Sequence, residues 1–140
     1  MRCLLILAHP RRDSFCGALF DAYADGARQS GIDCRELILS EMRFDPDVHA
    51  DSPEQQPLEP DLVRAQRDIQ WAEHLVFVYP TWWGTFPALL KGFLDRVLTP
   101  GFAFRHEGQG QWNKLLSGRT ADLITTMDTP PAIYRIVYRA

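Results

Sequence analysis

The sequence predicts an α/β domain built on a doubly wound parallel β-sheet. Short apolar runs, typical of strands buried on both faces, alternate along the chain with longer segments of helical periodicity. This alternation is the pattern of successive βαβ units, which form a parallel sheet. The chain has 140 residues, of which 46% are hydrophobic and 24% charged. We therefore expect one domain over residues 1–140 with a sizeable core.

The first part of the chain predicts two strands around one helix. The apolar run at residues 2–8 predicts the first strand. Apolar residues at helical spacing predict a helix over residues 14–30, which Gly31 ends. A second strand is predicted at residues 34–39. Residues 40–60 form a long polar connection, and connections of this length are usually functional or mobile.

The second part continues the alternation. The expected elements are, in order, a helix at residues 61–72, a strand at 75–79, a helix at 87–98, a short strand within 101–105, a strand at 120–126 and a helix from 130 to 140. Pro87 and the pair Pro130-Pro131 are placed where proline is favoured, at the start of a helix.

The carboxyl ends of the predicted strands hold the most unusual residues. Open parallel sheets bind ligands beyond these ends, at the point where the strand order reverses. The loops at that edge follow the first, third and fourth long strands, and they begin at His9, Tyr79 and Thr125. The sheet would bring these distant segments together, which predicts a ligand site at this edge.

The loop after the first strand has the features of a phosphate site. Ser14 offers a hydroxyl, His9 an imidazole, and the start of the next helix offers the free N–H groups of Phe15 and Cys16. The sequence holds no G-x-G-x-x-G dinucleotide fingerprint. The alternative is structural: Asp13 or Ser14 only caps the helix, and His9 only occupies a turn.

Two adjacent tryptophans, Trp82 and Trp83, stand in the loop after the third strand, between Pro80 and Pro87. Loops lie on the surface, and two indoles there favour a flat ligand such as an isoalloxazine or nicotinamide ring. The two prolines would preorganise the loop. The alternative is that the indoles fill a gap in the core or an oligomer interface.

The loop after the fourth long strand offers polar groups. Thr125 and Thr126 supply hydroxyls, and the backbone supplies N–H groups for the polar edge of a ligand. Asp128 has an alternative role as the cap of the helix that opens at Pro130.

Four segments together resemble the flavodoxin-like NAD(P)H:quinone oxidoreductase family, of the flavodoxin-2 type. They are His9 with Ser14-Phe15, the run Pro80-x-x-Trp83-x-x-x-Pro87-Ala-Leu-Leu-Lys-Gly-Phe-Leu-Asp-Arg-Val-Leu98, Gly101-Phe-Ala-Phe104, and residues 115–126. The resemblance covers almost the whole chain. Its most specific part is the helix segment from Pro87 followed by Gly-Phe-Ala at residues 101–103.

The resemblance implies a flavodoxin-like fold and a bound FMN or FAD. By matching position, the flavin would be held by His9, Ser14, Phe15 and Cys16 at its phosphates, by Pro80, Thr81, Trp82 and Trp83 along the isoalloxazine, and by Thr125, Thr126, Met127 and Asp128 at its polar edge.

The resemblance also implies a reaction. NAD(P)H would give a hydride to the flavin, which would pass it to a quinone or similar small acceptor. Members of the family are usually homodimers with the site at the interface, where Phe104 would reach the partner's flavin. We nominate no catalytic base, and His9 is only a weak candidate for a proton relay. FMN and FAD, like NADH and NADPH, stay open alternatives.

The chain also departs from the family pattern. Cys16 stands where many relatives have asparagine, Met127-Asp128 where some have two glycines, and Phe104 where some have tyrosine. A flavodoxin-like sheet has five strands in the order 2-1-3-4-5, but here the fifth strand is missing. We therefore expect an exposed edge at the fourth long strand. Either the chain is a shortened form of a longer protein, which we favour and which would fold poorly alone, or a partner covers this edge.

Composition argues against several classes of protein. A net charge of −3 gives no electrostatic basis for binding nucleic acid. No apolar run approaches the ~20 residues of a membrane span, and the apolar N-terminal run is too short for a signal peptide, so we expect a cytoplasmic protein. Cys3, Cys16 and Cys34 have no C-x-x-C spacing and are expected as free thiols. We find no set of residues with metal-ligand spacing, so no metal is expected.

Two other functions stay open. A flavodoxin-type electron carrier would bind flavin without a hydride donor, but such carriers use a hydroxyl- and glycine-rich phosphate loop that this chain lacks. A non-catalytic regulatory subunit is the second alternative, because some relatives serve as ancillary subunits of membrane ion-efflux systems.

Overall fold

A computed structural model describes residues 1–108 and 110–138. Its main sheet has four parallel strands in the order β2-β1-β3-β6, which confirms the α/β class and the predicted order of the four long strands. The strands are β1 (Arg2–Leu7), β2 (Asp33–Ile38), β3 (His74–Pro80) and β6 (Thr120–Thr126). The helices are α1 (Phe15–Gln29), α2 (Pro60–Trp71), α3 (Ala88–Val97) and α4 (Pro131–Tyr138).

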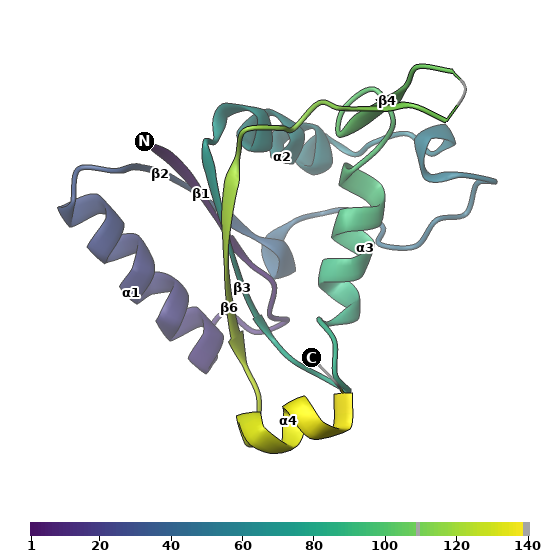
Figure 1. The fold of residues 1–140 in the computed structure, drawn as a ribbon. Helices are drawn as coiled ribbons and strands as arrows, with labels where there is room; N and C mark the ends of the chain where they lie inside the picture. The colour runs from purple at the N-terminus through teal and green to yellow at the C-terminus, as the bar shows by residue number, and fades with distance from the viewer. Residues whose placement is uncertain (109, 139–140) are drawn as a thin grey trace.

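The helices cover both faces of the sheet, with α1 on one face and α2 and α3 on the other (Figure 1). β1 is one of the two inner strands, and its side chains alternate between the two faces. Leu4 and Ile6 pack with α2 and α3, whereas Leu5 and Leu7 pack with α1. Because both faces of this strand are buried, its sequence is an unbroken run of apolar residues rather than an alternation of apolar and polar ones.

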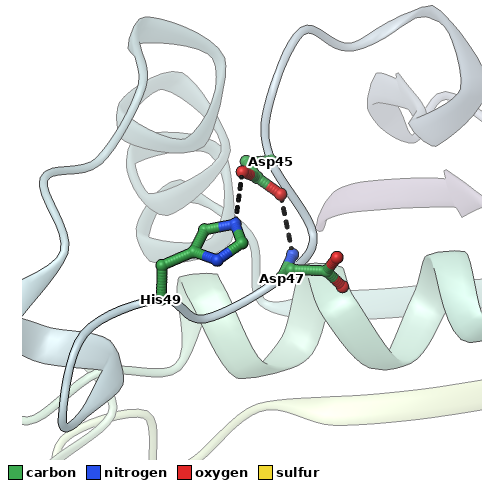
Figure 2. Close-up of side chains that lie close together, drawn as sticks. All are labelled: Asp45, Asp47 and His49. Carbon is green, nitrogen blue, oxygen red and sulfur yellow. Dashed lines mark hydrogen bonds and ion pairs between the residues drawn. The ribbon is translucent and has the colours of Figure 1, made fainter.

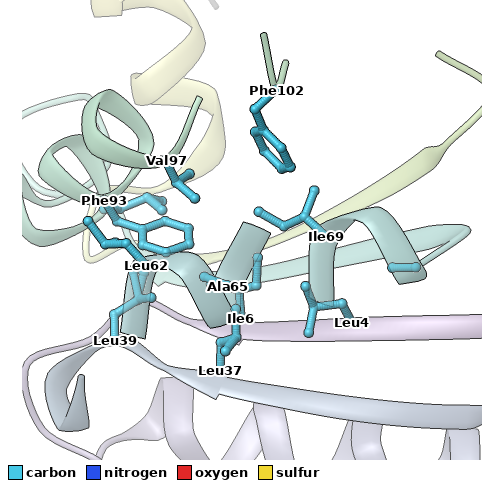
Figure 3. Packing of buried hydrophobic residues seen from close by; sticks show 13 residues of the cluster. Leu4, Ile6, Leu37, Leu39, Leu62, Ala65, Ile69, Phe93, Val97 and Phe102 are labelled. Atoms are coloured by element: carbon cyan, nitrogen blue, oxygen red, sulfur yellow. The ribbon is translucent and has the colours of Figure 1, made fainter. Parts of the chain in front are cut away.

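The larger core lies between the sheet and helices α2 and α3 (Figure 3). Ile6 of β1, Leu62 of α2 and Phe93 of α3 are all fully buried in it. Full burial of each such side chain contributes about 1.5–3 kcal/mol. This packing fixes α3 against the sheet, and it thereby fixes the loop that leads from β3 into α3.

The ends of α1 lie close to where the sequence predicts them. Ser14 is the N-cap, and its hydroxyl accepts a hydrogen bond from the Gly17 N–H at 3.2 Å. Gly31 follows the helix with a φ of 73°, a left-handed conformation that glycine adopts without steric cost.

The long connection between β2 and α2 is ordered by its contacts with α3. It contains two short 3-10 turns, Leu39–Glu41 and Pro53–Gln55. The fully buried guanidinium of Arg96 donates hydrogen bonds to the carbonyls of Asp45 (2.6 Å) and Pro57 (2.7 Å). Its ion pair with Glu59, at 3.0 Å, completes the anchor. Residues 45–59 therefore pack along α3.

The segment between α3 and β6 contains an antiparallel hairpin of β4 (Phe104–His106) and β5 (Trp112–Lys114). The short strand predicted within 101–105 corresponds to β4, which begins at Phe104 because Gly101 has a φ of 83° and opens a turn, and which extends to His106. The partner strand β5 is not predicted by the sequence, since three exposed residues carry no alternating pattern.

The three cysteines are free, as predicted. Cys3 and Cys16 are buried and Cys34 is half-buried. Burial, reinforced by the neighbouring Cys34, raises the pKa of the Cys3 thiol to about 11. Among the described helices, none combines the length and the apolar character that a bilayer crossing requires.

Candidate functional site

Two adjoining cavities open at the carboxyl edge of the sheet and share Met127, Asp128 and Thr129. The first, here called the α1 cavity, has a volume of about 700 Å³ and is lined by Phe15, Leu19, Thr125, Thr126, Met127, Asp128, Thr129 and Pro130. The second, here called the tryptophan cavity, has a volume of about 400 Å³ and is lined by Thr81, Trp82, Trp83, Gly84, Met127, Asp128, Thr129 and Tyr134. The three predicted loops therefore meet.

The α1 cavity lies against the N-terminus of a helix. The Ser14 hydroxyl accepts a hydrogen bond from the Gly17 N–H. The N–H groups of Phe15 and Cys16, which come first in the helix, have no acceptor within it. Together with the helix dipole, these groups favour an anion. The Phe15 side chain is 70% exposed beside them.

The loop from His9 to Ser14 folds closely onto α1. The carbonyl of Arg12 lies so near Gly17 that a Cβ at that position would overlap it. The Arg12 guanidinium is paired with Asp21 on α1. The anion-binding groups at this end are therefore backbone N–H groups rather than this arginine.

The Cys16 side chain does not face open solvent. It is only 2% exposed, and its Sγ lies 3.3 Å from the hydroxyl of Thr126, at the end of β6. This contact joins the first turn of α1 to the loop after β6. The backbone N–H of Cys16, and not its thiol, is thus the group placed to serve an anion.

The two tryptophans stand in a tight turn. The N–H of Trp82 donates to the Thr85 carbonyl at 2.9 Å, and the N–H of Thr85 donates back at 3.1 Å. The residues between them, Trp83 and Gly84, have φ values of 53° and 79°, as a type I′ turn requires. Trp83 adopts this left-handed conformation without being glycine, and it is 97% exposed.

His9 connects the first loop to the second. Its ring meets that of Trp82 edge-on, with centroids 5.9 Å apart at an angle of 68°. Its Nδ1 lies 3.0 Å from the N–H of Arg11. His9 therefore lies beside an aromatic wall of the site, and it lines neither of the two cavities.

The second and third loops are joined by hydrogen bonds among three threonines. The Thr81 N–H donates to the Thr126 carbonyl at 2.7 Å, and the hydroxyl oxygens of Thr81 and Thr125 lie 2.6 Å apart. Pro80 is buried at the end of β3 and stands opposite Thr126 in the strand register. These contacts extend the β3–β6 pairing into the loops and fix their separation.

Tyr134 is a site residue that the sequence reasoning missed. It lines the tryptophan cavity, and its hydroxyl donates to the Gly84 carbonyl at 3.1 Å. The signal was present, because the proline pair predicts a helix there and Tyr134 lies in its first turn. Gly84, Thr129, Pro130 and Leu19 also line the cavities without having been predicted.

Phe104 is not brought to this site within one chain. It lies in the β4–β5 hairpin, at the edge where the strands begin, whereas α4 lies near the edge where they end (Figure 1). Its ring packs 5.0 Å from that of Trp112, whose ring also lies 3.8 Å from that of His106.

Asp45, Asp47 and His49 form a cluster that the sequence reasoning also missed (Figure 2). One potential ligand atom from each lies within 4.8 Å of the others. All three residues are exposed, and the Asp45 carboxylate already accepts the Asp47 N–H (2.9 Å) and contacts His49 Nε2 (3.0 Å). The Asp47 N–H, with a smaller contribution from His49, lowers the pKa of Asp45. The Asp45 carboxylate is therefore already engaged within the cluster.

A further cavity of about 730 Å³ lies between β2, the segment that follows it and α2, and it shares no lining residue with the two cavities described above. Its lining is mainly charged, and two of the charge pairs are formed within the protein. Arg35 pairs with Asp68 at 2.7 Å, and Arg64 pairs with Asp61 at 3.4 Å. These ion pairs explain the charged lining of the cavity as a surface ion-pair network.

Comparison with known proteins identifies the family to which this α/β fold belongs. The flavodoxin-like fold family, of the flavodoxin-2 type, matches residues 1–138. The chain belongs to this family, which confirms the resemblance recognised from its motifs. The chain spans 53–61% of the length of the first curated relatives that it matches.

Three relatives are similar over most of this chain. One is an uncharacterised NAD(P)H oxidoreductase, YcaK, of Escherichia coli K12, 33% identical over 122 residues, which are 81% of this chain and 61% of that protein. The structure of an NAD(P)H:quinone oxidoreductase from Methanothermobacter marburgensis matches with a TM-score of 0.82 and 26% identity, over 95% of this chain and 70% of that one. General stress protein 14 of Treponema denticola, in complex with FMN, matches with a TM-score of 0.67 and 27% identity, over 98% and 68%.

Proposed function

We propose that this protein is a flavin-dependent oxidoreductase, which passes a hydride from NAD(P)H, through FMN or FAD, to a quinone or similar small acceptor. The observation that carries the proposal is the meeting of three loops at the carboxyl edge of the sheet. There a helix N-terminus, an aromatic turn and a threonine-rich loop surround two joined cavities. Similarity to a quinone oxidoreductase and to an FMN-bound protein supports this reading.

The residues present fit a flavin. Its phosphate requires anion donors, which the N–H groups of Phe15 and Cys16 offer at the start of α1. Its ring requires a flat apolar wall, which Trp82 and Trp83 offer beside the second cavity. Its polar edge requires hydrogen-bonding groups, which the loop from Thr125 to Asp128 provides between the two.

When bound, the flavin supplies the hydride chemistry, and the protein supplies binding and orientation. Ser14 and the N-terminus of α1 would hold the phosphate end. Pro80, Thr81 and the tryptophan turn would orient the ring, and Thr126, Met127 and Asp128 would offer hydrogen-bonding groups to its polar edge. Tyr134 keeps the turn in place through its bond to the Gly84 carbonyl. His9, at the edge of the Trp82 indole, is the candidate proton relay.

We propose a cytoplasmic homodimer in which the hairpin of one copy, with Phe104, reaches the site of the other. The cluster of Phe104, His106 and Trp112 supports this, because Trp112 is 56% exposed and all three rings lie together on a projecting hairpin. Such aromatic groups are enriched at protein interfaces.

The test is reconstitution followed by turnover. The chain is titrated with FMN and with FAD while flavin fluorescence is recorded, and then supplied with NADPH or NADH and a soluble quinone. We expect one flavin to bind with quenching, and nucleotide oxidation that depends on the quinone. Flavin binding without turnover would indicate an electron carrier, and no binding of either flavin would contradict the proposal.

A further inference from the structure

Two cysteines, Cys3 and Cys34, stand opposite each other on neighbouring strands. They are partners in the register of β1 and β2, and each is the second residue of its strand. Both side chains lie on the face of the sheet that α1 covers, where Cys3 is buried and Cys34 packs against the same cluster. The two thiols are far apart in the sequence, and the pairing of β1 with β2 brings them together.

This register places the two residues within reach of a disulfide. Neighbouring strands of a sheet lie about 4.8 Å apart, and disulfides join residues whose Cα atoms are about 4.4–6.8 Å apart. The two side chains leave the sheet on the same face, side by side. Within the described sheet β2 pairs with β1 alone, so a small shift of β2 on forming the bond would disturb one strand pairing only.

The two thiols affect each other's ionisation. Burial raises the pKa of the Cys3 thiol to about 11, and the neighbouring Cys34 contributes to that rise. Burial also raises the pKa of Cys34, but the Arg28 guanidinium and the Cys3 thiol oppose this rise. Such mutual effects act over short distances, which agrees with the pairing of the two residues in the strand register.

The two thiols differ in access and in their surroundings. Cys34 is half-buried, whereas Cys3 is 1% exposed. The charge of Arg28, in the last turn of α1, favours a Cys34 thiolate. On its other side Cys3 neighbours His74 of β3, which lies 3.3 Å from the Asp122 carboxylate, and the charge of that carboxylate disfavours a Cys3 thiolate. Cys34 is therefore the thiol that reacts first with an oxidant.

We propose that Cys3 and Cys34 form a redox-active pair, which a small-molecule disulfide oxidises to an internal disulfide between β1 and β2. The Cys34 thiolate attacks one sulfur of the small disulfide, whose S–S bond breaks and releases one thiol. The Cys3 sulfur then loses its proton to solvent, attacks Cys34 Sγ and displaces the second thiol. The protein gives up two electrons and two protons, and the small disulfide becomes two thiols.

The first step of this exchange promotes the second. The charge and the hydrogen bonding of Cys34 both raise the pKa of Cys3, and both effects are lost once Cys34 is held in a mixed disulfide. The Cys3 thiolate then forms more readily, beside the sulfur that it attacks. The mixed disulfide on Cys34 is therefore short-lived, and the internal disulfide is the product that accumulates.

The pair lies away from the candidate flavin site. Cys3 and Cys34 stand near the starts of β1 and β2, whereas the two cavities open where the strands end. The third thiol, Cys16, contacts Thr126 at that opposite edge. The inference therefore does not rest on the proposed function, and Cys16 serves as an internal control.

The decisive test uses the folded, unsubstituted chain without flavin. It is equilibrated in buffers with rising ratios of glutathione disulfide to glutathione, unfolded in N-ethylmaleimide to block free thiols, and mapped by mass spectrometry. We expect a Cys3–Cys34 link, with Cys16 recovered as the blocked thiol. Three free thiols, a chain that stops with glutathione on Cys34, or a link to Cys16 would each overturn the inference.

Single substitutions test the order of the two steps. Cys16→Ala should form the link as the unsubstituted chain does. Cys3→Ala should stop with glutathione bound to Cys34, whereas Cys34→Ser should leave Cys3 unmodified, because Cys3 is 1% exposed. If Cys3 took up glutathione in Cys34→Ser as fully as Cys34 does in Cys3→Ala, the assigned order would be wrong.

A second measurement is the melting temperature. The disulfide closes a loop that contains the whole of α1, and it thereby restricts the unfolded chain. We expect the oxidised chain to melt roughly 10 °C above the reduced chain. The same treatment should leave the melting temperature of Cys34→Ser unchanged. Equal melting temperatures of the oxidised and reduced unsubstituted chain would contradict a link between β1 and β2.

Discussion

The hydroxyl oxygens of Thr81 and Thr125 lie 2.6 Å apart, and they join the loops that leave two neighbouring strands. Each threonine lines one of the two cavities, so their hydrogen bond holds the wall between the tryptophan cavity and the α1 cavity, where we propose that the ring and the phosphate of a flavin bind. The spacing of the two binding regions is therefore set by the sheet and by a contact just beyond it.

Thr81→Val tests this contact. The substitution keeps the branched shape but removes the hydroxyl, at a cost of about 1 kcal/mol for one hydrogen bond. We expect flavin affinity to fall by roughly five-fold, measured by fluorescence titration. Thr120→Val is the matched control at the other end of β6, where the hydroxyl contacts His74 at 2.7 Å. An equal loss of affinity in both variants would assign the effect to general stability.

Gly17→Ala tests the close packing of the first loop on α1. A Cβ at Gly17 would overlap the Arg12 carbonyl, so the loop must shift, at a cost of about 1–3 kcal/mol. We expect a lower melting temperature and weaker flavin binding, because the loop carries Ser14 and His9. Gly26→Ala in the same helix meets no atom within 4 Å and should raise stability by about 0.5–1 kcal/mol. Unchanged binding in Gly17→Ala would contradict the role given to this loop.

Trp83→Gly should separate stability from binding. Glycine relieves the left-handed conformation at this position, which costs a non-glycine residue about 1–2 kcal/mol. The indole is 97% exposed, so its loss removes little packing. We expect a melting temperature that is unchanged or higher, together with weaker flavin binding and less quenching. If flavin affinity were retained, Trp83 would have no part in the site.

Arg96→Met tests the anchor of the 45–59 segment. The substitution leaves the Glu59 carboxylate and the carbonyls of Asp45 and Pro57 without their buried partner. Breaking a buried pair in this way costs about 3–5 kcal/mol. We expect urea unfolding to show a loss of this size. Lys91→Met, which removes an exposed pair with Asp95 on the same helix, should cost far less. Similar losses would contradict the anchoring role.

The same anchor predicts a dependence of stability on pH. Burial alone would raise the pKa of Glu59, but the Asp45 N–H and the Arg96 guanidinium outweigh it and lower that pKa below 4.5. A carboxylate with a lowered pKa adds stability above its unfolded pKa, and this is lost as the pH falls through the folded pKa. We expect the free energy of unfolding to drop in that acid range, and to drop less in Glu59→Gln. Parallel pH profiles would contradict this assignment.

The sequence predicts those parts of the fold that hydrophobic pattern and helix ends determine. β1 is buried on both faces, and Ser14 and Gly31 mark the ends of α1, so these elements could be predicted. The β5 strand could not, because its three exposed residues are ordered only by pairing with β4. Nor could the packing of residues 45–59, which depends on a charged side chain, Arg96, being buried on α3.

The candidate site likewise has a part that could be predicted from the sequence and a part that could not. The rule that parallel strands present their carboxyl ends at one edge was enough to bring Phe15, Trp82 and Thr125 together. It could not place Tyr134, whose position depends on how α4 crosses that edge. The orientation of the Cys16 thiol towards Thr126 also depends on side-chain packing, which spacing along the chain does not reveal.

The most direct test of the proposed flavin site is the visible spectrum of the purified chain, supplied with FMN or FAD, before and after anaerobic addition of NADPH. We expect a protein-bound flavin spectrum that bleaches when NADPH is added and returns when a quinone follows. A protein that stays colourless and takes up neither flavin would contradict the central claim that the three loops at the carboxyl edge form a flavin site.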